Sequence, residues 1–356
     1  MAIRIVVSYK AIDQGHGPAA VGLLAISFSV IPLLLAMAVG KRIDRTGGRR
    51  DGIAGALVMT LASVSLVVGS SLIFLIVASA VFGLGQLICI VSQQATIART
   101  VPAREHPGAF GRYNIFTSVG QVVGPVIVTG LASTGAAGST GPVIAALFGA
   151  LTLLCCFAIP RAEAAAVPAG GAGQAEGGTL IGMQNMGLAM VVSMSAIASM
   201  EIVLIYLPVW GEQNGVPQAV VGILLSVRAA STIVGQLIVR PLLDRVGRAA
   251  LLRASFGVAA AAMALLPVCN QVTCLIPMVA LGLTFGLTQP VTLSWVVALA
   301  GEGRSGAALG LRVTAGRVGQ VLAPGVAAGL SWFGGTSAVF LFSSTFLLAT
   351  ALTRIR

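Results

Sequence analysis

The chain has 356 residues, of which 57% are hydrophobic and only 9% are charged, and its mean hydropathy is +0.99. Soluble domains carry about 25% charged residues, so this composition excludes a soluble globular protein and favours a chain embedded in a lipid bilayer. The net charge of +11 does not indicate nucleic-acid binding, because the basic residues lie in short loops between apolar spans and form no aromatic-rich basic face.

Apolar segments of about 20 residues, long enough to cross a bilayer as helices, recur along the whole chain. We predict eleven of them, at 20–39, 52–69, 72–98, 111–133, 142–159, 184–209, 219–239, 250–268, 274–299, 309–331 and 336–353. Residues 1–9 are apolar but too few to span. The stretch 160–179 is rich in Ala, Gly and Pro and predicts a flexible linker. The predicted domains are an N-terminal bundle at 1–159, a cytoplasmic linker at 160–183 and a C-terminal bundle at 184–356.

The distribution of basic residues predicts the orientation of these helices. One set of loops is rich in lysine and arginine, with Lys41, Arg104, Arg161 and Arg253 among them, whereas the opposite set holds only Lys10. Loops rich in lysine and arginine stay on the cytoplasmic side, so we expect the linker and the C-terminus to be cytoplasmic.

The five cysteines are too few and too scattered for a disulfide scaffold. Cys89, Cys155 and Cys156 fall inside apolar spans. Cys269 and Cys274 flank a short polar turn, where a disulfide and two free thiols both fit the sequence; we favour free thiols.

A short polar sequence occurs twice between apolar spans. Asp44–Arg45–x–Gly47 returns 200 residues later as Asp244–Arg245–x–Gly247, and Val21–Leu24 matches Val221–Leu224 at the same offset. Further matches follow at an offset of 199, namely Gly83 with Gly282, Gly111 with Gly310 and Gly120–Pro125 with Gly319–Pro324. Both copies have the same predicted orientation, so the chain consists of two parallel repeats.

The first copy resembles the signature G-x-L-A-D-R-x-G-R-R of the major facilitator superfamily, which follows the second helix of that family. The matching residues are Gly40, Asp44, Arg45, Gly47, Arg49 and Arg50, and the departures are Arg42, Ile43 and Gly48. The resemblance covers essentially the whole chain. It implies an all-α integral membrane fold of two helical bundles and a transporter rather than an enzyme, with no cofactor and no metal.

The repeat also aligns Met1 with Glu201, which lies well inside the predicted helix 184–209. Half of the family's first helix therefore has no counterpart here, and we expect eleven complete transmembrane helices plus a partial first one. A mis-set start codon or a truncated gene is the favoured explanation, and a genuine eleven-helix protein is the alternative.

The resemblance implies that both polar loops act as conformational latches. In the family, such an aspartate pairs with an arginine or a helix N-terminus on the cytoplasmic side and holds the outward-facing state. The residues concerned are Gly40, Asp44, Arg45, Gly47, Arg49 and Arg50 in the first loop, and Asp244, Arg245, Gly247 and Arg248 in the second. The alternative is an ordinary basic loop, which would not repeat D-R-x-G in the same register.

The helix 111–133 carries Gly111, Gly120, Gly124 and Pro125 at a spacing that resembles the family motif of drug and metabolite antiporters. Glycines let neighbouring helices approach closely, and proline bends a helix. The family motif continues with a Gly–Gly pair at the positions of Val128 and Thr129, so the match is partial. It indicates export, and ordinary helix packing is the alternative.

Three charged residues, Glu201, Arg228 and Arg317, lie inside predicted apolar helices, and Arg4 lies in the N-terminal stretch. Charges in such places are costly and face a cavity or a partner. Glu201 is the only carboxylate deep in a predicted span and is the leading candidate to carry a proton, with Arg228 and Arg317 as its possible partners. The alternative is a static ion pair.

Weaker candidates for substrate contact are polar residues on the helices 72–98, 184–209 and 274–299, which line the central cavity in the family, and two residues at the inner end of the helix 111–133. They are Gln86, Gln93, Arg112, Asn114, Gln184, Asn185, Tyr206, Thr288, Gln289 and Trp295. Hydrogen bonding between helices is the alternative role for each of them.

We expect a secondary transporter of the bacterial inner membrane that works by alternating access and draws on the proton gradient. Its partners are a small-molecule substrate, protons and the lipid bilayer. The first candidate function is efflux of a small apolar molecule or metabolite by proton antiport. The second is uptake of a sugar or organic acid by proton symport, and the third is a transport-incompetent remnant or sensor.

Overall fold

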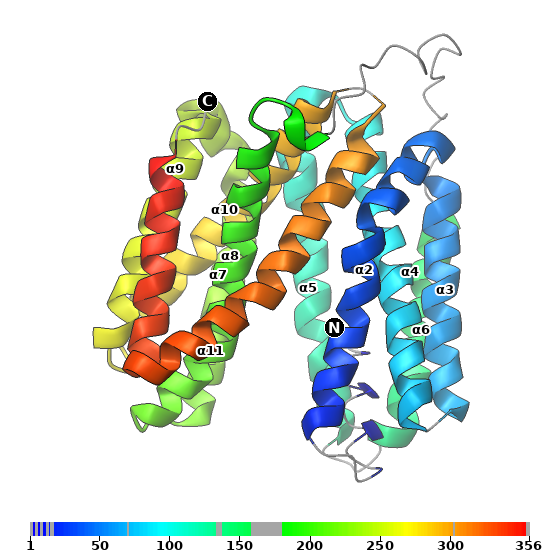
Figure 1. Ribbon diagram of the computed structural model, residues 1–356, viewed down its shortest axis with the longest axis horizontal. Coiled ribbons are helices and arrows are strands. Elements are labelled where there is room, and N and C mark those ends of the chain that lie inside the picture. Colours follow the sequence, from blue (N-terminus) through cyan, green and yellow to red (C-terminus); the bar gives the residue numbers. More distant parts are fainter. Residues whose placement is uncertain are drawn as a thin grey trace. The chain divides into compact units, whose positions relative to one another are not determined.

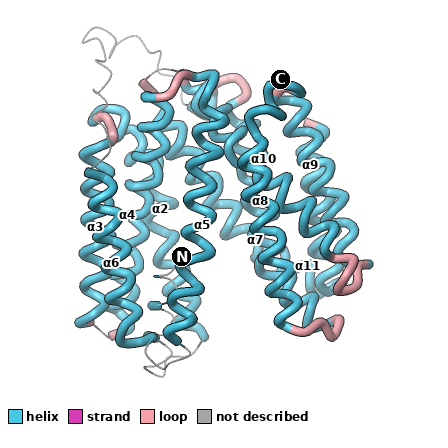
Figure 2. The backbone as a smooth tube through the Cα atoms, turned by 180° about the vertical axis from the view of Figure 1, so that it is seen from behind, coloured by secondary structure: helices cyan, strands magenta, loops and turns pink. Residues whose placement is uncertain are grey.

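The computed structural model describes residues 3, 6–7, 10–11, 14, 18–69, 71–132, 137–157, 180–301 and 303–353. Within these residues the regular elements are all helical, as predicted, and the helices are joined by short loops (Figure 2). The long helices in chain order are α2 Pro18–Thr46, α3 Arg49–Val68, α4 Leu72–Thr100, α5 His106–Ala132, α6 Ala137–Phe157, α7 Met186–Gln213, α8 Gln218–Val246, α9 Arg248–Leu265, α10 Leu275–Ala300 and α11 Ser305–Leu352. Single 3-10 turns occur at Ala103–Glu105, Leu180–Gly182 and Leu266–Val268.

Many large apolar side chains point outward from these helices. Leu34 is 73% exposed, Leu61 58% and Ile73 76%. Water would not tolerate apolar surface on this scale, whereas lipid does. Within the described residues, eight helices are long and apolar enough to cross a membrane. The finer count of eleven complete helices and a partial first one stays a prediction.

Several helix boundaries differ from the predicted ones. α2 continues to Thr46 and α8 to Val246, so each Asp–Arg pair lies in the last helical turns rather than in a loop. After each of these two helices the backbone turns at a glycine with a positive φ angle, which is 85° at Gly47 and 79° at Gly247. The amino acids before these glycines are polar but still form helices, because the helix extends past its apolar part until a residue breaks it.

α7 begins at Met186, so Gln184 and Asn185 lie in the preceding turn and not on the predicted helix 184–209. Asn185 has a left-handed backbone, with φ of 68°. Asparagine tolerates that conformation, and a residue that adopts it stops a helix from extending toward the N-terminus.

The predicted helices 309–331 and 336–353 form one continuous element, α11, which has 48 residues. Gly335, with φ of 61°, lies between the two predicted segments. The ribbon reverses its direction where its colour changes from orange to red (Figure 1). The two predicted spans are therefore two arms of α11, joined at a glycine without an intervening loop.

The chain divides into two compact units. Unit 1 comprises Met1–Thr100, Thr117–Gly178 and Ala300–Thr314, and unit 2 comprises Val101–Phe116, Thr179–Leu299 and Ala315–Arg356. The start of α11 thus belongs to unit 1, and the start of α5 belongs to unit 2. The predicted division into bundles at 1–159 and 184–356, with a linker at 160–183, stays a prediction.

Both units use the same close approach of helices at glycine. A Cβ atom on Gly83 of α4 would collide with the carbonyl oxygen of Phe28 on α2, and one on Gly282 of α10 would collide with that of Arg228 on α8. These pairs are related by the repeat offsets of 199 and 200 residues. The repeat in the sequence is therefore a repeat of packing contacts.

Cys269 and Cys274, whose pairing the sequence left open, are both free thiols. Burial and the neighbouring Cys269 together raise the pKa of the Cys274 thiol to about 12. A thiol with so high a pKa is hardly ionised at neutral pH, which slows its oxidation. Free thiols at this turn agree with the favoured interpretation.

We expect Gly83→Ala to lower the thermal stability of the purified protein, because its new methyl group would press on the backbone of α2. Overpacking of this kind costs about 1–3 kcal/mol. The matched control is Gly257→Ala on α9, where a Cβ atom meets nothing within 4 Å. Alanine favours helices over glycine by about 1 kcal/mol, so the control should be neutral or more stable. Equal unfolding temperatures for the two variants would contradict the packing contact.

Candidate functional site

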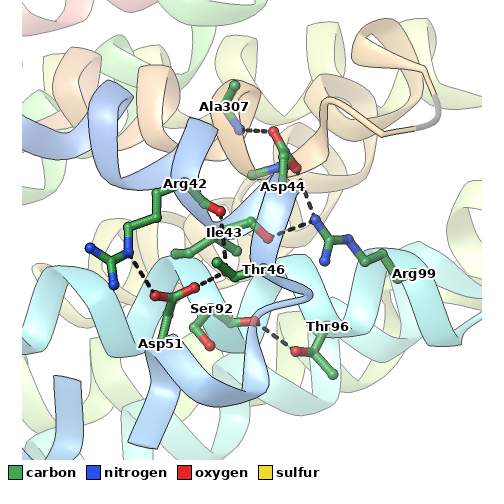
Figure 3. Close-up of polar contacts among 10 residues, drawn as sticks. Arg42, Ile43, Asp44, Thr46, Asp51, Ser92, Thr96, Arg99 and Ala307 are labelled. Atoms are coloured by element: carbon green, nitrogen blue, oxygen red, sulfur yellow. Dashed lines mark hydrogen bonds and ion pairs between the residues drawn. The ribbon is translucent and has the colours of Figure 1, made fainter. Parts of the chain in front are cut away.

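Asp44, in the last turn of α2, accepts hydrogen bonds from three donors. The backbone N–H of Gly306 donates to Oδ1 at 2.7 Å, the N–H of Ala307 donates to Oδ2 at 2.8 Å, and Arg99 Nη2 donates to Oδ1 at 3.1 Å. Figure 3 shows the carboxylate between Ala307 and the Arg99 guanidinium. The side chains of Asp44 and Arg99 are only 10% and 12% exposed.

Two of these donors are backbone groups in the first turn of α11. The first N–H groups of a helix have no partner within the helix, and the helix dipole favours a negative charge at that end. The Asp44 carboxylate therefore caps α11 while Arg99 balances its charge. Arg99 also donates to the carbonyl oxygen of Ile43 at 3.0 Å, which fixes the guanidinium to the end of α2.

Gly40 explains how α2 comes close enough to α11 for this contact. A Cβ atom on Gly40 would collide with the carbonyl oxygen of Gly306 and lie 2.9 Å from the Cα atom of Ala307. One turn further along α11, a Cβ atom on Gly310 would likewise collide with the carbonyl oxygen of Ala36. Glycine at positions 40, 306 and 310 brings the two backbones together, so that the short aspartate side chain reaches the α11 terminus.

A second carboxylate, Asp51 on α3, fixes the turn between α2 and α3. Arg42 Nε donates to Asp51 Oδ1 at 3.1 Å, and the Thr46 hydroxyl donates to Oδ2 (Figure 3). The Asp51 side chain is 6% exposed, whereas that of Arg42 is 74% exposed. At the start of α3, Arg49 Nη2 donates to the carbonyl oxygen of Phe157 at 2.8 Å. Arg42, which departs from the family signature, thus helps to hold Asp51 at the turn between α2 and α3.

The second copy of the sequence has a different environment. Asp244 and Arg245, at the end of α8, are both exposed, and no ion pair within the described residues includes either of them. Arg248 instead lies over the indole ring of Trp295, with its guanidinium carbon 5.2 Å from the ring centroid. The two loops match in sequence but not in their contacts.

The sequence pointed to Asp44 but not to its partners. Arg99 was only one of several basic residues at helix ends. Asp51 had no distinguishing feature in the sequence except its position next to the loop. Gly306 and Ala307 contribute backbone groups, which no side-chain pattern reveals. Arg45 and Arg50, which match the family signature, are exposed.

The four residues of the antiporter-like pattern lie on α5. A Cβ atom on Gly111 would lie 2.7 Å from the carbonyl oxygen of Gln236 on α8, whereas one on Gly120 would meet nothing within 4 Å. The side-chain surroundings of Gly124 and Pro125 lie outside the described part of the chain. Gly111 is thus a close-packing position, and Gly310 makes the equivalent contact in the other repeat.

Charged and amide side chains meet near the middle of the helices of unit 2. Glu201 lies close to the midpoint of α7, and Gln320 on α11 donates from Nε2 to Glu201 Oε1 at 2.8 Å. Arg317 Nη1 donates to Oε1 of the same glutamine at 3.1 Å. Arg228 on α8 is 6% exposed and interacts electrostatically with Glu201. We call these four residues the mid-span cluster; Gln320 is the member that the sequence did not suggest.

The predicted cavity residues lie in varied environments. Gln86, Gln93, Asn114 and Gln289 are half-buried, and Arg112 and Gln184 are exposed. Asn185 is half-buried and occupies the N-cap position of α7 without a capping hydrogen bond from its side chain. Tyr206 and Thr288 are buried, and the Thr288 hydroxyl donates to the carbonyl oxygen of Phe285 in its own helix. Trp295 is 1% exposed and lies beneath Arg248. Arg4, which the sequence also suggested as an intramembrane charge, lies outside the described residues.

We expect Asp44→Asn to destabilise the purified protein by about 1–3 kcal/mol, because the amide group presents a donor to a backbone N–H and leaves Arg99 without a counter-charge. Thermal unfolding in detergent measures the loss, and membrane insertion should be unchanged. Asp244→Asn is the matched control at the exposed copy and should stay within about 0.5 kcal/mol of the parent. Equal losses for the two variants would contradict the unequal roles of the two copies.

Comparisons with known proteins identify the family and the fold. The model of the Major Facilitator Superfamily matches residues 1–213 and 188–355. A search of curated proteins found no match.

Three solved structures share the fold at low sequence identity. The human organic anion transporter MFSD10 is 16% identical, with a TM-score of 0.78 over 98% of this chain and 88% of that one. The E. coli fucose:proton symporter is 12% identical, with a TM-score of 0.75 over 100% and 97%. A bacterial homologue of the iron transporter ferroportin in the outward-facing state is 15% identical, with a TM-score of 0.77 over 99% and 93%.

The family match spans both repeats, and the helices have the length and composition of membrane spans. The fold supports secondary transport by alternating access, and the protein is a transporter and not an enzyme. This multi-pass membrane protein therefore belongs to the major facilitator superfamily.

Proposed function

We propose that this protein is a proton-coupled secondary transporter of a small organic molecule and that Glu201 carries the proton. The observation behind the proposal is the position of Glu201 near the midpoint of α7, where it accepts a hydrogen bond from the neutral Gln320 amide. Transporters bind substrate and coupling ions near the bilayer midplane. A carboxyl group at this depth alternates between a charged and a neutral form, and the energy difference between them is large in a membrane.

The surroundings of Glu201 suit a group that gains and loses a proton. The carboxylate is hydrogen-bonded to an amide, and no ion pair of the described residues joins it to Arg228 within 4.0 Å. A static ion pair with Arg228, one of the two pairs considered from the sequence, therefore has less support. Arg317 orients the amide that holds the carboxylate, because its Nη1 donates to Gln320 Oε1 at 3.1 Å.

We further propose that Asp44 serves as a conformational latch. Its bonds to the first turn of α11 involve segments 262 and 263 residues apart in the chain. A movement that separates α2 from α11 would break the two hydrogen bonds that the backbone N–H groups of α11 donate to the Asp44 carboxylate. It would also expose the charge of Arg99. The contact thereby favours the arrangement in which these ends lie together, which in this family is the outward-facing state.

The first candidate for the direction of transport is efflux of a small apolar molecule or metabolite in exchange for protons. It rests on the resemblance of α5 to the antiporter pattern and on the close approach of Gly111 to α8. The second candidate is uptake together with a proton, and the specific observation in its favour is the electrostatic interaction of the buried Arg228 with Glu201. A fucose:proton symporter has the same fold, so that architecture accommodates proton symport.

In this proposal the protein resides in the inner membrane of a bacterium, with its arginine-rich loops and its C-terminus in the cytoplasm. Half-buried residues such as Gln86, Gln93 and Asn114 are candidates for substrate contact, and Tyr206 and Thr288 are buried candidates.

We expect Glu201→Gln to abolish proton-driven accumulation in proteoliposomes while exchange of substrate across the membrane continues. Glutamine resembles the protonated carboxyl group and cannot release a proton, so exchange should lose its dependence on pH. The readout is uptake of labelled substrate with and without an imposed pH gradient. Glu212→Gln, at the exposed end of α7, is the matched control. Proton-driven accumulation by Glu201→Gln would place the coupling site elsewhere.

The direction of transport is tested with everted membrane vesicles that have an acidic interior and with right-side-out vesicles that have an acidic exterior. Everted vesicles correspond to export from the cell, so efflux predicts substrate accumulation in them, driven by proton exit. Uptake by symport predicts accumulation in right-side-out vesicles with an acidic exterior instead. Accumulation in neither preparation, over a panel of drugs and metabolites, would count against proton-coupled transport.

A further inference from the structure

Four of the five cysteines form two pairs of neighbouring thiols. Cys269 and Cys274 lie in the turn before α10, and their side chains are hydrogen-bonded. The second pair joins two helices, because Cys89 lies on α4 and Cys156 lies in the last turn of α6. Cys89 is 4% exposed and Cys156 is 1% exposed, and both belong to one buried cluster with Ala56 of α3. We call Cys89 and Cys156 the α4–α6 dithiol.

The two thiols of the α4–α6 dithiol are in direct contact. The side chains of Cys89 and Cys156 are hydrogen-bonded to each other. The Cys89 thiol also donates to the carbonyl oxygen of Gly52 on α3, at 3.5 Å. Both sulfur atoms therefore occupy one small space between α3, α4 and α6. Neighbouring thiols of this kind are the arrangement from which a disulfide forms without a large movement of the backbone.

The second repeat shows that the shared packing does not require thiols at these positions. The offset of 199 residues matches Cys89 with Thr288 and Cys156 with Ile355. Thr288 is 2% exposed, and its hydroxyl donates to the carbonyl oxygen of Phe285 in its own helix. A residue buried at this position thus satisfies its polar group within one helix. The contact between two thiols on different helices is a feature of the first repeat.

The α4–α6 dithiol lies close to the ends of two helices. Cys156 directly precedes Phe157, the last residue of α6, and Gly52 lies in the first turn of α3. One helical turn spans about 5 Å, so the thiols lie roughly one turn inside these helix ends. Burial at this depth excludes bulky and charged reagents. A small uncharged oxidant such as hydrogen peroxide reaches such a place.

We propose that the α4–α6 dithiol is an oxidation site, at which hydrogen peroxide converts Cys89 and Cys156 into a disulfide that links α4 to α6. The Cys156 thiol gives its proton to water at the end of α6, and its sulfur attacks one oxygen of the peroxide. The O–O bond breaks, and the hydroxide that leaves takes up that proton and becomes water. Cys156 is then a sulfenic acid.

The second step closes the disulfide. The Cys89 sulfur attacks the Cys156 sulfur, the S–O bond of the sulfenic acid breaks, and the leaving hydroxide takes the Cys89 proton. Two thiols are thereby oxidised, and one molecule of peroxide is reduced to two molecules of water.

The order of the two cysteines follows from their surroundings. The proton of Cys89 is directed at the Gly52 carbonyl, and Cys89 lies in the interior of α4. Cys156 lies at a helix end instead. Cys156 is therefore the thiol that reacts with peroxide, and Cys89 is the thiol that resolves the sulfenic acid. Cys155 provides a comparison, because it is the neighbouring residue but is exposed and lies outside the buried cluster.

The test uses the purified full-length protein with Cys155→Ala, Cys269→Ser and Cys274→Ala, which retains two of the five cysteines. The folded protein is treated with hydrogen peroxide and then denatured, and its free thiols are counted by mass after reaction with a maleimide. We expect both thiols to be free before treatment and neither after it, with both restored by dithiothreitol. A bulky charged maleimide should label neither thiol in the folded protein. If this variant does not fold, peptide mapping of the oxidised parent protein should find Cys89 linked to Cys156.

Two single changes in the same background test the order of attack. With Cys89→Ala, the sulfenic acid at Cys156 has no thiol to resolve it and should be trapped by dimedone. With Cys156→Ala, trapping at Cys89 should be severalfold weaker. Mass spectrometry of the labelled peptides measures both.

The disulfide should also stabilise the folded protein, because it closes the loop from residue 89 to residue 156 and thereby restricts the unfolded chain. The unfolding temperature should rise after oxidation and return to its first value with dithiothreitol. Peroxide treatment of Cys89→Ala, in which no disulfide forms, is the matched control and should give no rise.

The proposal is overturned if both thiols survive peroxide treatment of the folded protein, if dithiothreitol does not restore them, or if the linked peptides of the parent join other cysteines. Equal trapping in the two single variants would overturn the order of attack. An unfolding temperature that does not rise would overturn the fit of the disulfide to the native packing. These measurements involve no transport, so their outcome and that of the proposed function are independent.

Discussion

Inside a bilayer no water is present to satisfy backbone N–H and C=O groups, and this constraint governs the whole structure. It requires helices through the apolar region, and it leaves the ends of those helices as the only places where backbone groups need outside partners. The contact of Asp44 with the first turn of α11 is one such solution, since two otherwise unpaired N–H groups donate to one carboxylate. The glycines at positions 40, 306 and 310 are part of it, because only a residue without Cβ lets the two backbones approach so closely.

The two repeats share their packing and differ in their chemistry. The same glycine contacts recur at Gly83 and Gly282, and again at Gly111 and Gly310. The polar contacts, in contrast, differ between the two repeats. The capped, buried aspartate is in the first repeat, where Asp44 is bonded and its counterpart Asp244 is exposed. The mid-span charges are in the second repeat, where Arg228 occupies the position that Phe28, stacked on Phe82, occupies in the first. The two repeats thus share a scaffold of packing contacts and carry different polar contacts on it.

For each contact of the candidate site, the sequence indicated one of the two residues involved. Asp44 was predicted because D-R-x-G is repeated in register, and Glu201 because a carboxylate in an apolar span is rare. The residues that donate hydrogen bonds to them were not predicted, although the sequence named Arg228 and Arg317 as possible charged partners of Glu201. Arg99 lies 55 residues from Asp44 in the chain, and Gln320 lies 119 residues from Glu201. An arginine at a helix end or a glutamine in a repeated segment has many possible partners, and no local spacing selects one of them. Gln184 and Asn185 were assigned to a helix whose start depends on one left-handed residue, which the apolar pattern does not detect.

The sequence by itself determined that this is a helical membrane protein of two parallel repeats and which family it resembles, because composition, span length and repeat offset are properties of the chain alone. Only the tertiary structure decided that Asp44 and not Asp244 is the buried, bonded copy, that α11 turns at Gly335 without a loop, and that Arg228 lies near Glu201 without a direct ion pair. The physical reason is that hydrogen bonds and charge interactions act over a few ångströms in space, and helices distant in sequence meet at distances that only their packing sets.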